Sequence, residues 1–232
     1  RGDADFAGAV VSLGALGVVA AVELEIEPTF DIAQTVYERV PVAAVRDGFV
    51  EIASSAYSVS IFTTLRDDEV VDQVWRKERT DVAALPLPDA LAGREADGPR
   101  HPLPGVSAEA CTVQGGVAGP WLDRLPHFRL ELTPSNGEEL QSEFLLPIER
   151  AGEAFDAVRA LAERLRSVLQ ICEIRTVAAD DLWLSPASGR DSVAFHFTWR
   201  ADDARVAAVL PHLEAALAPF DARPHWGKVF VA

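Results

Sequence analysis

The fold of this chain is decided by residues 171–199, which read ICEIRTVAADDLWLSPASGRDSVAFHFTW. Polar and apolar side chains alternate at both ends of this stretch, from Ile171 to Val177 and from Ser192 to Trp199. Successive side chains of a β-strand point to opposite faces, so a period of two predicts a strand at each end. Each strand is expected to have one apolar face and one polar face.

Segments on both sides extend this pattern. The other expected strands lie at 34–40, 57–65, 70–79 and 140–146, and the second and third of these alternate well. The expected helices lie at 42–54, 148–169 and 202–217, and the second has apolar residues at three- and four-residue spacing. Strand runs followed by a helix, two strands and a helix predict an α+β fold with a largely antiparallel sheet flanked by helices.

The connections are predicted from turn residues and composition. Arg66-Asp67-Asp68 separates two strands that resemble a hairpin, and Pro134-Ser135-Asn136-Gly137 predicts a turn before the next strand. Asp202 or Asp203 is expected to cap the last helix. Residues 81–126 are rich in Pro and Gly and form either a surface excursion or a loop lining a site, because such long loops are uncommon in compact domains.

The first thirty residues predict a short Gly/Ala-rich helix, a tight turn and a strand. The helix begins near Gly8, and the turn is placed at Gly14 or Gly17. Apolar and acidic residues alternate from Val18 to Glu27, which predicts the strand, and Pro28 ends it.

Charge and cysteine content argue against several classes of function. The formal net charge is −15, from 21 Lys+Arg against 36 Asp+Glu, so neither a nucleic acid nor a membrane is an expected partner. Cys111 and Cys172 lie far apart without a zinc-type spacing, so no metal site is expected. Two reduced thiols in a cytoplasmic protein are favoured over one disulfide. No secretory signal is found, and the apolar run 6–24 is too short and too interrupted to predict a membrane span.

Three short polar clusters near the end of the chain carry the candidate chemistry. The first is Glu173 with Arg175, which share one face of the strand expected at 171–177. A solvent-facing ion pair and a substrate site are about equally supported for this pair. As a substrate site, the carboxylate and the guanidinium would together bind several hydroxyl groups.

The second cluster is His196 with Thr198 on the strand expected at 192–199. The opposite face of that strand carries three aromatic residues, Phe195, Phe197 and Trp199. The histidine is either a structural residue on an exposed face or a general base near neutral pH.

The third cluster is His225-Trp226-Gly227-Lys228. It is either a terminal turn or part of a site, and four distinctive residue types in a row favour the site. Lys228 could hold or polarise an oxygen atom, and Gly227 allows close approach of the backbone. If the three clusters converge, they form a pocket for a compound rich in hydroxyl groups.

Several stretches resemble the vanillyl-alcohol-oxidase-type flavoproteins. Residues 5–19 are similar to the end of their flavin-binding domain. The substrate domain of the sugar-lactone and alditol oxidase branch is resembled at 119–121, 125–128 and 140–147. Cys172-Glu173-Ile174-Arg175-Thr176 and Arg223-Pro224-His225-Trp226-Gly227-Lys228 resemble the bacterial alditol (xylitol) oxidases.

The resemblance implies an FAD enzyme that oxidises the terminal carbinol of a polyol, such as xylitol or sorbitol, to an aldose. Oxygen would accept the electrons and become hydrogen peroxide. Glu173 and Arg175 would bind substrate hydroxyls, with Arg175 also counted among the catalytic residues. Thr198 would contact the substrate further along its chain. His196 would be the base, and Lys228 would bind and polarise the reacting oxygen.

The resemblance also implies cofactor contacts, through the backbone of Gly17 and Val18 and through His225. The amino-terminal half of that family, with its pyrophosphate-binding loops and FAD-linking histidine, has no counterpart in this sequence. The chain alone is therefore expected neither to hold FAD nor to turn over substrate. It starts at Arg1 and has no methionine, which suggests a fragment. The expected parts are 1–29 as a remnant of the FAD domain, 30–218 as the substrate (cap) domain and 219–232 as a segment returning to the flavin site.

Two alternatives stay open. A sugar-1,4-lactone oxidase would act on a ring lactone, whereas the Glu173, Arg175, His196 and Thr198 set favours an open polyol. A stand-alone sugar-binding module without a redox half would have no catalytic activity. Turnover of xylitol against a lactone, and flavin absorbance, distinguish these possibilities.

Overall fold

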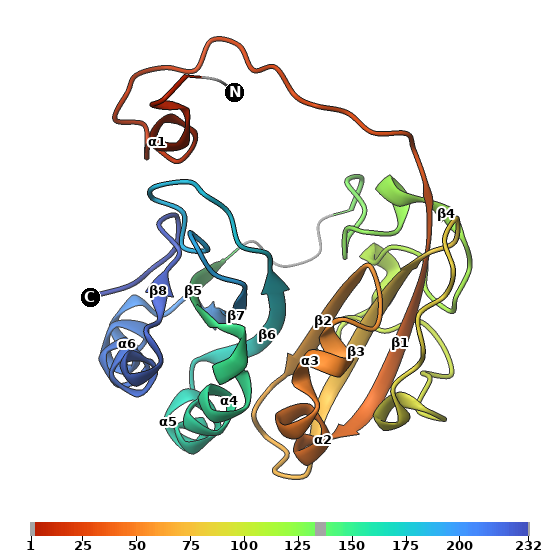
Figure 1. Cartoon of the computed structure of the whole chain (residues 1–232). Helices are drawn as coiled ribbons and strands as arrows, with labels where there is room; N and C mark the ends of the chain where they lie inside the picture. The colour runs from red at the N-terminus through yellow and green to blue at the C-terminus, as the bar shows by residue number, and fades with distance from the viewer. Residues whose placement is uncertain (1–2, 133–137, 232) are drawn as a thin grey trace.

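A computed structural model describes residues 3–132 and 138–231 and places their eight strands in one sheet. The strand order is β4-β1-β3-β2-β6-β7-β5-β8, and each neighbouring pair is antiparallel. The helices α2 to α6 lie along one side of this sheet (Figure 1). The α+β fold with an antiparallel sheet is therefore confirmed.

The elements have the following bounds. The strands are β1 (Asp31–Pro41), β2 (Ser58–Thr63), β3 (Val70–Arg79), β4 (Gly119–Pro120), β5 (Glu139–Pro147), β6 (Leu169–Val177), β7 (Ser192–Arg200) and β8 (Arg223–Pro224). The α-helices are α1 (Phe6–Val10), α2 (Val42–Asp47), α3 (Phe49–Ala53), α4 (Ala151–Ala160), α5 (Ala162–Leu165) and α6 (Asp203–Leu217). Short 3₁₀ turns lie at Asp89–Leu91, Ala108–Ala110, Trp121–Asp123, Ile148–Arg150 and Ala218–Phe220.

The sheet consists of two four-stranded parts that meet between β2 and β6. Only three residue pairs make this junction, with Phe62 opposite Glu173 at its centre. By contrast, β6 pairs with β7 and β5 with β7 along almost their whole lengths. The junction therefore brings the polar face of β6 beside β2 and β3.

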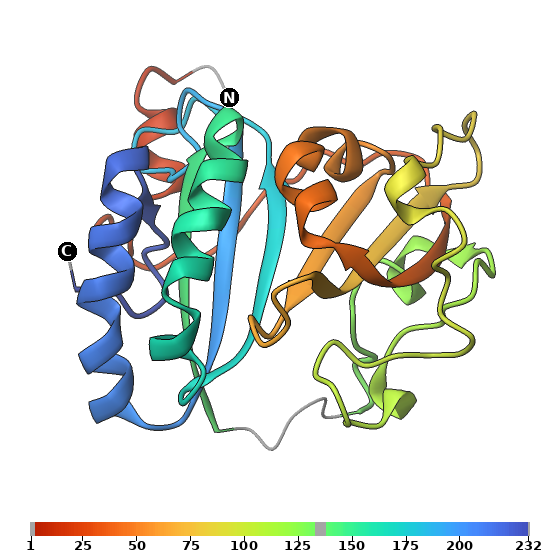
Figure 2. The same cartoon turned by 90° about the horizontal axis from the view of Figure 1, so that it is seen from below.

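The main hydrophobic core lies between the sheet and the helices α2 to α6, which cover one of its faces. Figure 2 shows α6, α4 and the α2–α3 pair side by side across that face. Phe195, Phe197 and Trp199 of β7 are fully buried there, and the rings of the last two stack at 5.2 Å. Burial of three large aromatic side chains is a major stabilising contribution, and it orients the polar face of β7 away from the helices.

Most of the predicted elements are confirmed. Strands form over the six segments expected after residue 30, and β2 pairs with β3 as the expected hairpin. Asp202 caps α6 by accepting a hydrogen bond from the Arg205 amide at 3.0 Å. The turn at Gly14 and Gly17 is also present, with φ values of 76° and 115° that favour glycine. The turn predicted at 134–137 lies outside the described residues.

The strand predicted from Val18 to Glu27 is wrong. These residues run as an exposed segment without regular secondary structure, and Val18 is 97% exposed and Ile26 94% exposed. Alternation produces a strand only where a partner strand accepts the backbone hydrogen bonds, and the sheet ends elsewhere, at β4 and β8. In Figure 1 the segment arches from α1 to β1, and α1 is held by a hydrogen bond from the Trp183 amide to the Ala7 carbonyl.

Two helix predictions are correct in place but wrong in extent. Residues 42–54 break into α2 and α3 at Gly48, a residue of low helix propensity. Residues 148–169 form a 3₁₀ turn, α4 and α5, and Leu169 already begins β6. Leu165 of α5 and Leu169 of β6 are both buried, so the apolar spacing continues past the end of the helix into the strand.

Within 3–132 and 138–231, no helix combines the length and apolar character needed to cross a bilayer. The same residues contain no cluster of three or more potential metal ligands. Cys111 and Cys172 are both buried and free, as expected for two reduced thiols.

Candidate active site

The candidate site lies on the face of β5, β6 and β7 opposite the helices. Strand register places Glu173 directly across from His196, and His196 directly across from Glu143. Side chains at paired positions on neighbouring strands share one face, so the three form a row of two carboxyl groups with an imidazole between them. Glu143 and Glu173 are both buried.

Arg175 joins the two carboxylates. One guanidinium nitrogen donates to Glu143 Oε1 at 2.9 Å, and another donates to Glu173 Oε2 at 3.2 Å. The Arg175 side chain is about one-third exposed (34%), so it reaches solvent while its partners are buried. The Glu173–Arg175 pair is therefore part of a buried network and not a solvent-facing ion pair.

Lys228 closes the other side of the row. Its ammonium donates to Glu143 and, at 2.8 Å, to Nδ1 of His196. The segment that carries Lys228 is tied to β5 by three hydrogen bonds. Two join backbones, from His225 N to Glu143 O and from Val229 N to Gln141 O, and the third is donated by the Ser142 hydroxyl to Val229 O. Because of these contacts, a residue 85 positions after Glu143 is fixed against it.

The tautomer of His196 follows from its donor. An ammonium has three N–H bonds and no lone pair, so Nδ1 of His196 must accept the hydrogen bond from Lys228. The imidazole hydrogen is then on Nε2, which faces the Thr198 hydroxyl at 3.4 Å. The predicted residues Glu173, Arg175, His196, Thr198 and Lys228 are thus brought together.

A second lysine–histidine pair lies beyond Glu173. Lys77 of β3 donates to Nδ1 of His127 at 3.2 Å, and Nε2 of His127 lies 3.0 Å from Glu173 Oε1. His127 ends the long loop that follows β3. That loop therefore lines the site, which was one of its two predicted roles.

Three residues of this network are not among the predicted site residues: Glu143, His127 and Lys77. Glu143 could have been found from the polar face of its strand, which alternates with Phe144. Lys77 could have been singled out by composition. The sequence has 19 arginines and only two lysines, Lys77 and Lys228, and Lys228 was already a predicted site residue. His127 carries no local signal, since only the loop path brings it to Glu173.

Electrostatics keep both carboxylates charged. Burial alone would raise the pKa of Glu173, but the hydrogen bond from His127 and the Arg175 charge outweigh it and lower the pKa to about 2. Burial is likewise outweighed at Glu143, where the charges and hydrogen bonds of Arg175 and Lys228 hold the pKa well below its ordinary value. Each carboxylate is therefore an acceptor for hydrogen bonds at neutral pH.

Burial acts in the opposite direction on the basic groups near Glu173. It lowers the pKa of Lys77 to about 8, although the Glu173 charge opposes the shift. It also lowers the pKa of His127, with the Lys77 charge adding to the effect. His127 is accordingly a neutral imidazole at pH 7.

A cavity of about 280 Å³ opens beside this second pair. Polar groups of Ser60, Lys77, His127, Glu173 and Arg175 line it. A cavity of this size and polarity suits a small compound rich in hydroxyl groups.

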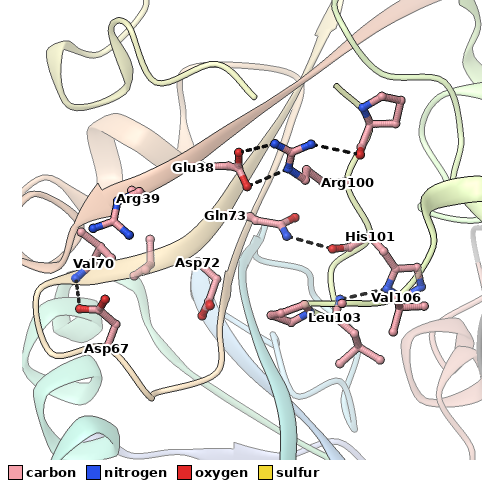
Figure 3. Close-up of a pocket in the computed structure, with 14 residues that line it drawn as sticks. Glu38, Arg39, Asp67, Val70, Asp72, Gln73, Arg100, His101, Leu103 and Val106 are labelled. Carbon is pink, nitrogen blue, oxygen red and sulfur yellow. Dashed lines mark hydrogen bonds and ion pairs between the residues drawn. The ribbon is translucent and has the colours of Figure 1, made fainter. Parts of the chain in front are cut away.

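Another cavity, of about 450 Å³, lies between β1, β3 and the 99–106 loop (Figure 3). The residues that line it include the ion pair of Glu38 with Arg100. They also include Gln73, which donates a hydrogen bond to the His101 carbonyl. None of the predicted site residues is among the residues that line it. The predicted chemistry therefore belongs to the β5–β6–β7 face.

The three predicted cofactor contacts lie outside the network. Gly17 and Val18 are on the exposed amino-terminal segment. The His225 side chain is also exposed and accepts a hydrogen bond from the Gly227 amide at 3.1 Å. The backbone amide of His225 donates to the Glu143 carbonyl at 2.9 Å.

Comparison with known proteins finds two similarities. Residues 135–232 match the family model of D-arabinono-1,4-lactone oxidase. The matched part contains Glu143, Glu173, Arg175, His196 and Lys228. The chain is also 52% identical, over 99% of its length, to an alditol oxidase from Streptomyces sp. (strain IKD472 / FERM P-14339). It spans 54% of the length of that relative.

Proposed function

We propose that this chain is the carboxy-terminal, substrate-binding part of an FAD-dependent alditol oxidase. The proposed reaction converts the terminal carbinol of an alditol, such as xylitol or sorbitol, to the aldose and reduces O₂ to H₂O₂. The observation that carries the proposal is the network of Glu143, Glu173, Arg175, His196 and Lys228 in a chain similar to an alditol oxidase.

Glu173 and Arg175 are proposed to bind substrate hydroxyls. Oε1 of Glu173 accepts from His127, Oε2 accepts from Arg175, and Ser60 is a third hydrogen-bond partner of the carboxylate. A carboxylate has about four acceptor sites, so one is left for a hydroxyl hydrogen. Arg175 is partly exposed and keeps N–H donors for hydroxyl oxygens. Thr198 would bind a hydroxyl further along the chain of the substrate.

Lys228 and His196 are proposed to act at the reacting oxygen. Removing the hydroxyl proton makes loss of a hydride from the same carbon easier, so a base and a cation both help. Nδ1 of His196 is occupied by Lys228, and it becomes free when the ammonium turns to the substrate oxygen. One movement would then both polarise the oxygen and expose the base. Arg175 adds a second positive charge, 3.4 Å from the same nitrogen.

The cofactor contacts are proposed on chemical fit. Val18 is exposed on an extended segment next to Gly17. Its apolar side chain and the backbone of both residues are therefore accessible to a planar ring system. Exposed His225 lies three residues before Lys228, on the same tethered segment. Bound FAD would supply the hydride acceptor and the route to O₂.

The division of the chain is part of this proposal. Residues 1–29 would belong with the FAD-binding domain, 30–218 would be the substrate domain and 219–232 would return to the flavin. The chain alone would then be inactive. The cytoplasm is the proposed compartment, supported by the two free, buried cysteines.

A sugar-1,4-lactone oxidase is the second candidate, favoured by the description of the matching family model. The two activities differ in substrate, an open polyol or a ring lactone. The test is peroxide formation by the full-length gene product with xylitol, sorbitol and an aldono-1,4-lactone. Faster turnover of the alditols supports the proposal, lactone-specific turnover supports the second candidate, and a colourless protein without flavin contradicts both.

A further inference from the structure

Lys77 is an unusual residue for its position. It is 2% exposed, and its ammonium donates to the Leu125 carbonyl at 2.7 Å and to His127 Nδ1 at 3.2 Å. Burying an ammonium group is unfavourable, and apolar residues occupy most such positions. The chain has 19 arginines and only two lysines, and each lysine donates to Nδ1 of a histidine in the site.

The lysine determines the tautomer of its histidine. Lys77 can only donate, so Nδ1 of His127 is the acceptor and the hydrogen resides on Nε2. That hydrogen points to Glu173 Oε1, 3.0 Å away. If the hydrogen were on Nδ1, two lone pairs would face each other at Glu173, and the hydrogen bond would be lost.

Glu173 is consequently held from two sides. His127 binds Oε1 and Arg175 binds Oε2, so the carboxyl plane cannot rotate without breaking a hydrogen bond. The same contacts keep the carboxyl group ionised, and an ionised carboxylate accepts hydroxyl hydrogens on both oxygens.

We propose that Lys77 and His127 are positioning residues for substrate binding by Glu173. Lys77 places the hydrogen of His127 on Nε2, and His127 then orients the Glu173 carboxylate toward the substrate hydroxyls. This inference rests on the proposed function. The charged and titratable groups around Glu173 are Lys77 on β3, His127 after the long loop, Arg175 on β6, His196 on β7, Glu143 on β5 and Lys228 in the carboxy-terminal segment.

The kinetic test uses the full-length flavoprotein with xylitol between pH 5 and pH 8. We expect His127→Leu and Lys77→Met to lower kcat/KM mainly through KM. Both changes remove or weaken the His127 hydrogen bond that lowers the pKa of Glu173. Their kcat/KM relative to the parent protein should therefore fall further as the pH is lowered, by up to about tenfold per pH unit once the pH is below the pKa of Glu173 in the variant. His127→Gln should restore most of the loss at every pH, because its amide can accept from Lys77 and donate to Glu173.

The controls separate a positioning role from a structural one. His212 is exposed on α6, so His212→Leu should match the parent protein at every pH. A purely structural role for the pair predicts a lowered thermal midpoint and a pH-independent loss. That result, with the parent protein active on xylitol, would overturn the positioning role and leave the proposed function standing. A parent protein inactive on every alditol would overturn both.

A second measurement does not depend on activity. Nitrogen-15 NMR of histidine-labelled protein reports the tautomer of each imidazole, with His212 as the exposed reference. We expect His127 to be neutral with its hydrogen on Nε2 at pH 7, and to lose that single tautomer in Lys77→Met. The Nδ1–H form in the parent protein, or an unchanged spectrum in the variant, would contradict the role of Lys77.

Discussion

Nζ of Lys228 lies 2.8 Å from Nδ1 of His196, although the two residues are 32 positions apart and on different elements. The contact determines which imidazole nitrogen carries hydrogen, and it occupies the other nitrogen with a cation. The imidazole of His196 and the ammonium of Lys228 are therefore coupled through one hydrogen bond. Under the proposed function, substrate binding would separate them before His196 accepts a proton.

Replacing Lys228 tests this coupling. In the full-length enzyme, Lys228→Met should lower kcat by about 100-fold to 1,000-fold, the usual effect of removing one donor to a developing negative charge. The effect on KM should be smaller, since the charge develops mainly in the transition state. Steady-state peroxide assays with xylitol measure both values. Unchanged kcat and KM would contradict the role given to Lys228.

Thr198 is expected to affect binding and not chemistry. Thr198→Val removes one hydroxyl at nearly constant volume, so KM for a polyol should rise about tenfold, as for one lost hydrogen bond. Thr198→Ser keeps the hydroxyl and is the matched control. The measurement is KM and kcat for alditols of three to six carbons. An equal loss for the shortest and longest alditols would contradict a contact far from the reacting carbon.

The ionised Glu173 side chain should stabilise the folded protein near neutral pH and lose this effect in acid. Its pKa is lowered from 4.5 to about 2 in the folded protein, so the stabilisation is complete above pH 4.5 and is lost as the pH falls through 2. Relative to Glu173→Gln, the unfolding free energy of the parent should decrease by about 3 kcal/mol across that window. Urea unfolding of both proteins at pH 6 and pH 2.5 measures this. A difference between the two proteins that does not depend on pH would show that Glu173 gains nothing from its charged partners.

Lys77 should change the pH dependence of stability in the alkaline range, because its buried charge is lost there. Its pKa is lowered from 10.5 to about 8, so the folded protein carries an unfavourable buried charge below pH 8. Stability should rise with pH between 8 and 10.5, where the unfolded chain holds more protons than the folded one. Lys77→Met should be more stable than the parent at pH 7, by up to about 3 kcal/mol, and the difference should vanish near pH 10.5. Denaturant unfolding at both pH values tests this, and a less stable variant at pH 7 would refute it.

Trp199 should be needed for the fold that positions the site. It is fully buried, stacks on Phe197, and its indole N–H donates to Ser142 Oγ at 3.0 Å. Trp199→Ala should lower the unfolding free energy by about 3–5 kcal/mol. Trp199→Phe keeps most of the buried area and loses mainly the hydrogen bond, so it should cost about 1–2 kcal/mol. Thermal and urea unfolding compare the two, and equal losses would indicate that the hydrogen bond dominates.

The alternation of residues 171–177 and 192–199 was sufficient to predict two strands and the side of each that carries Glu173, Arg175, His196 and Thr198. Periodicity succeeds here because it reflects which face of a strand meets a core, a local property of the chain. It failed between Val18 and Glu27, where the pattern is present but a partner strand is not.

By itself, the sequence determined the α+β class, the aromatic face of β7 and the residue types of the site. Only the tertiary structure decided that Glu143, His127 and Lys77 complete it. They come from β5, from the end of a long loop and from β3, and they meet Glu173 and His196 through strand register and loop path. Those relationships depend on contacts between residues 46 to 85 positions apart, which no local pattern encodes. Tautomers and pKa shifts follow from the same contacts, so they too belong to the folded protein alone.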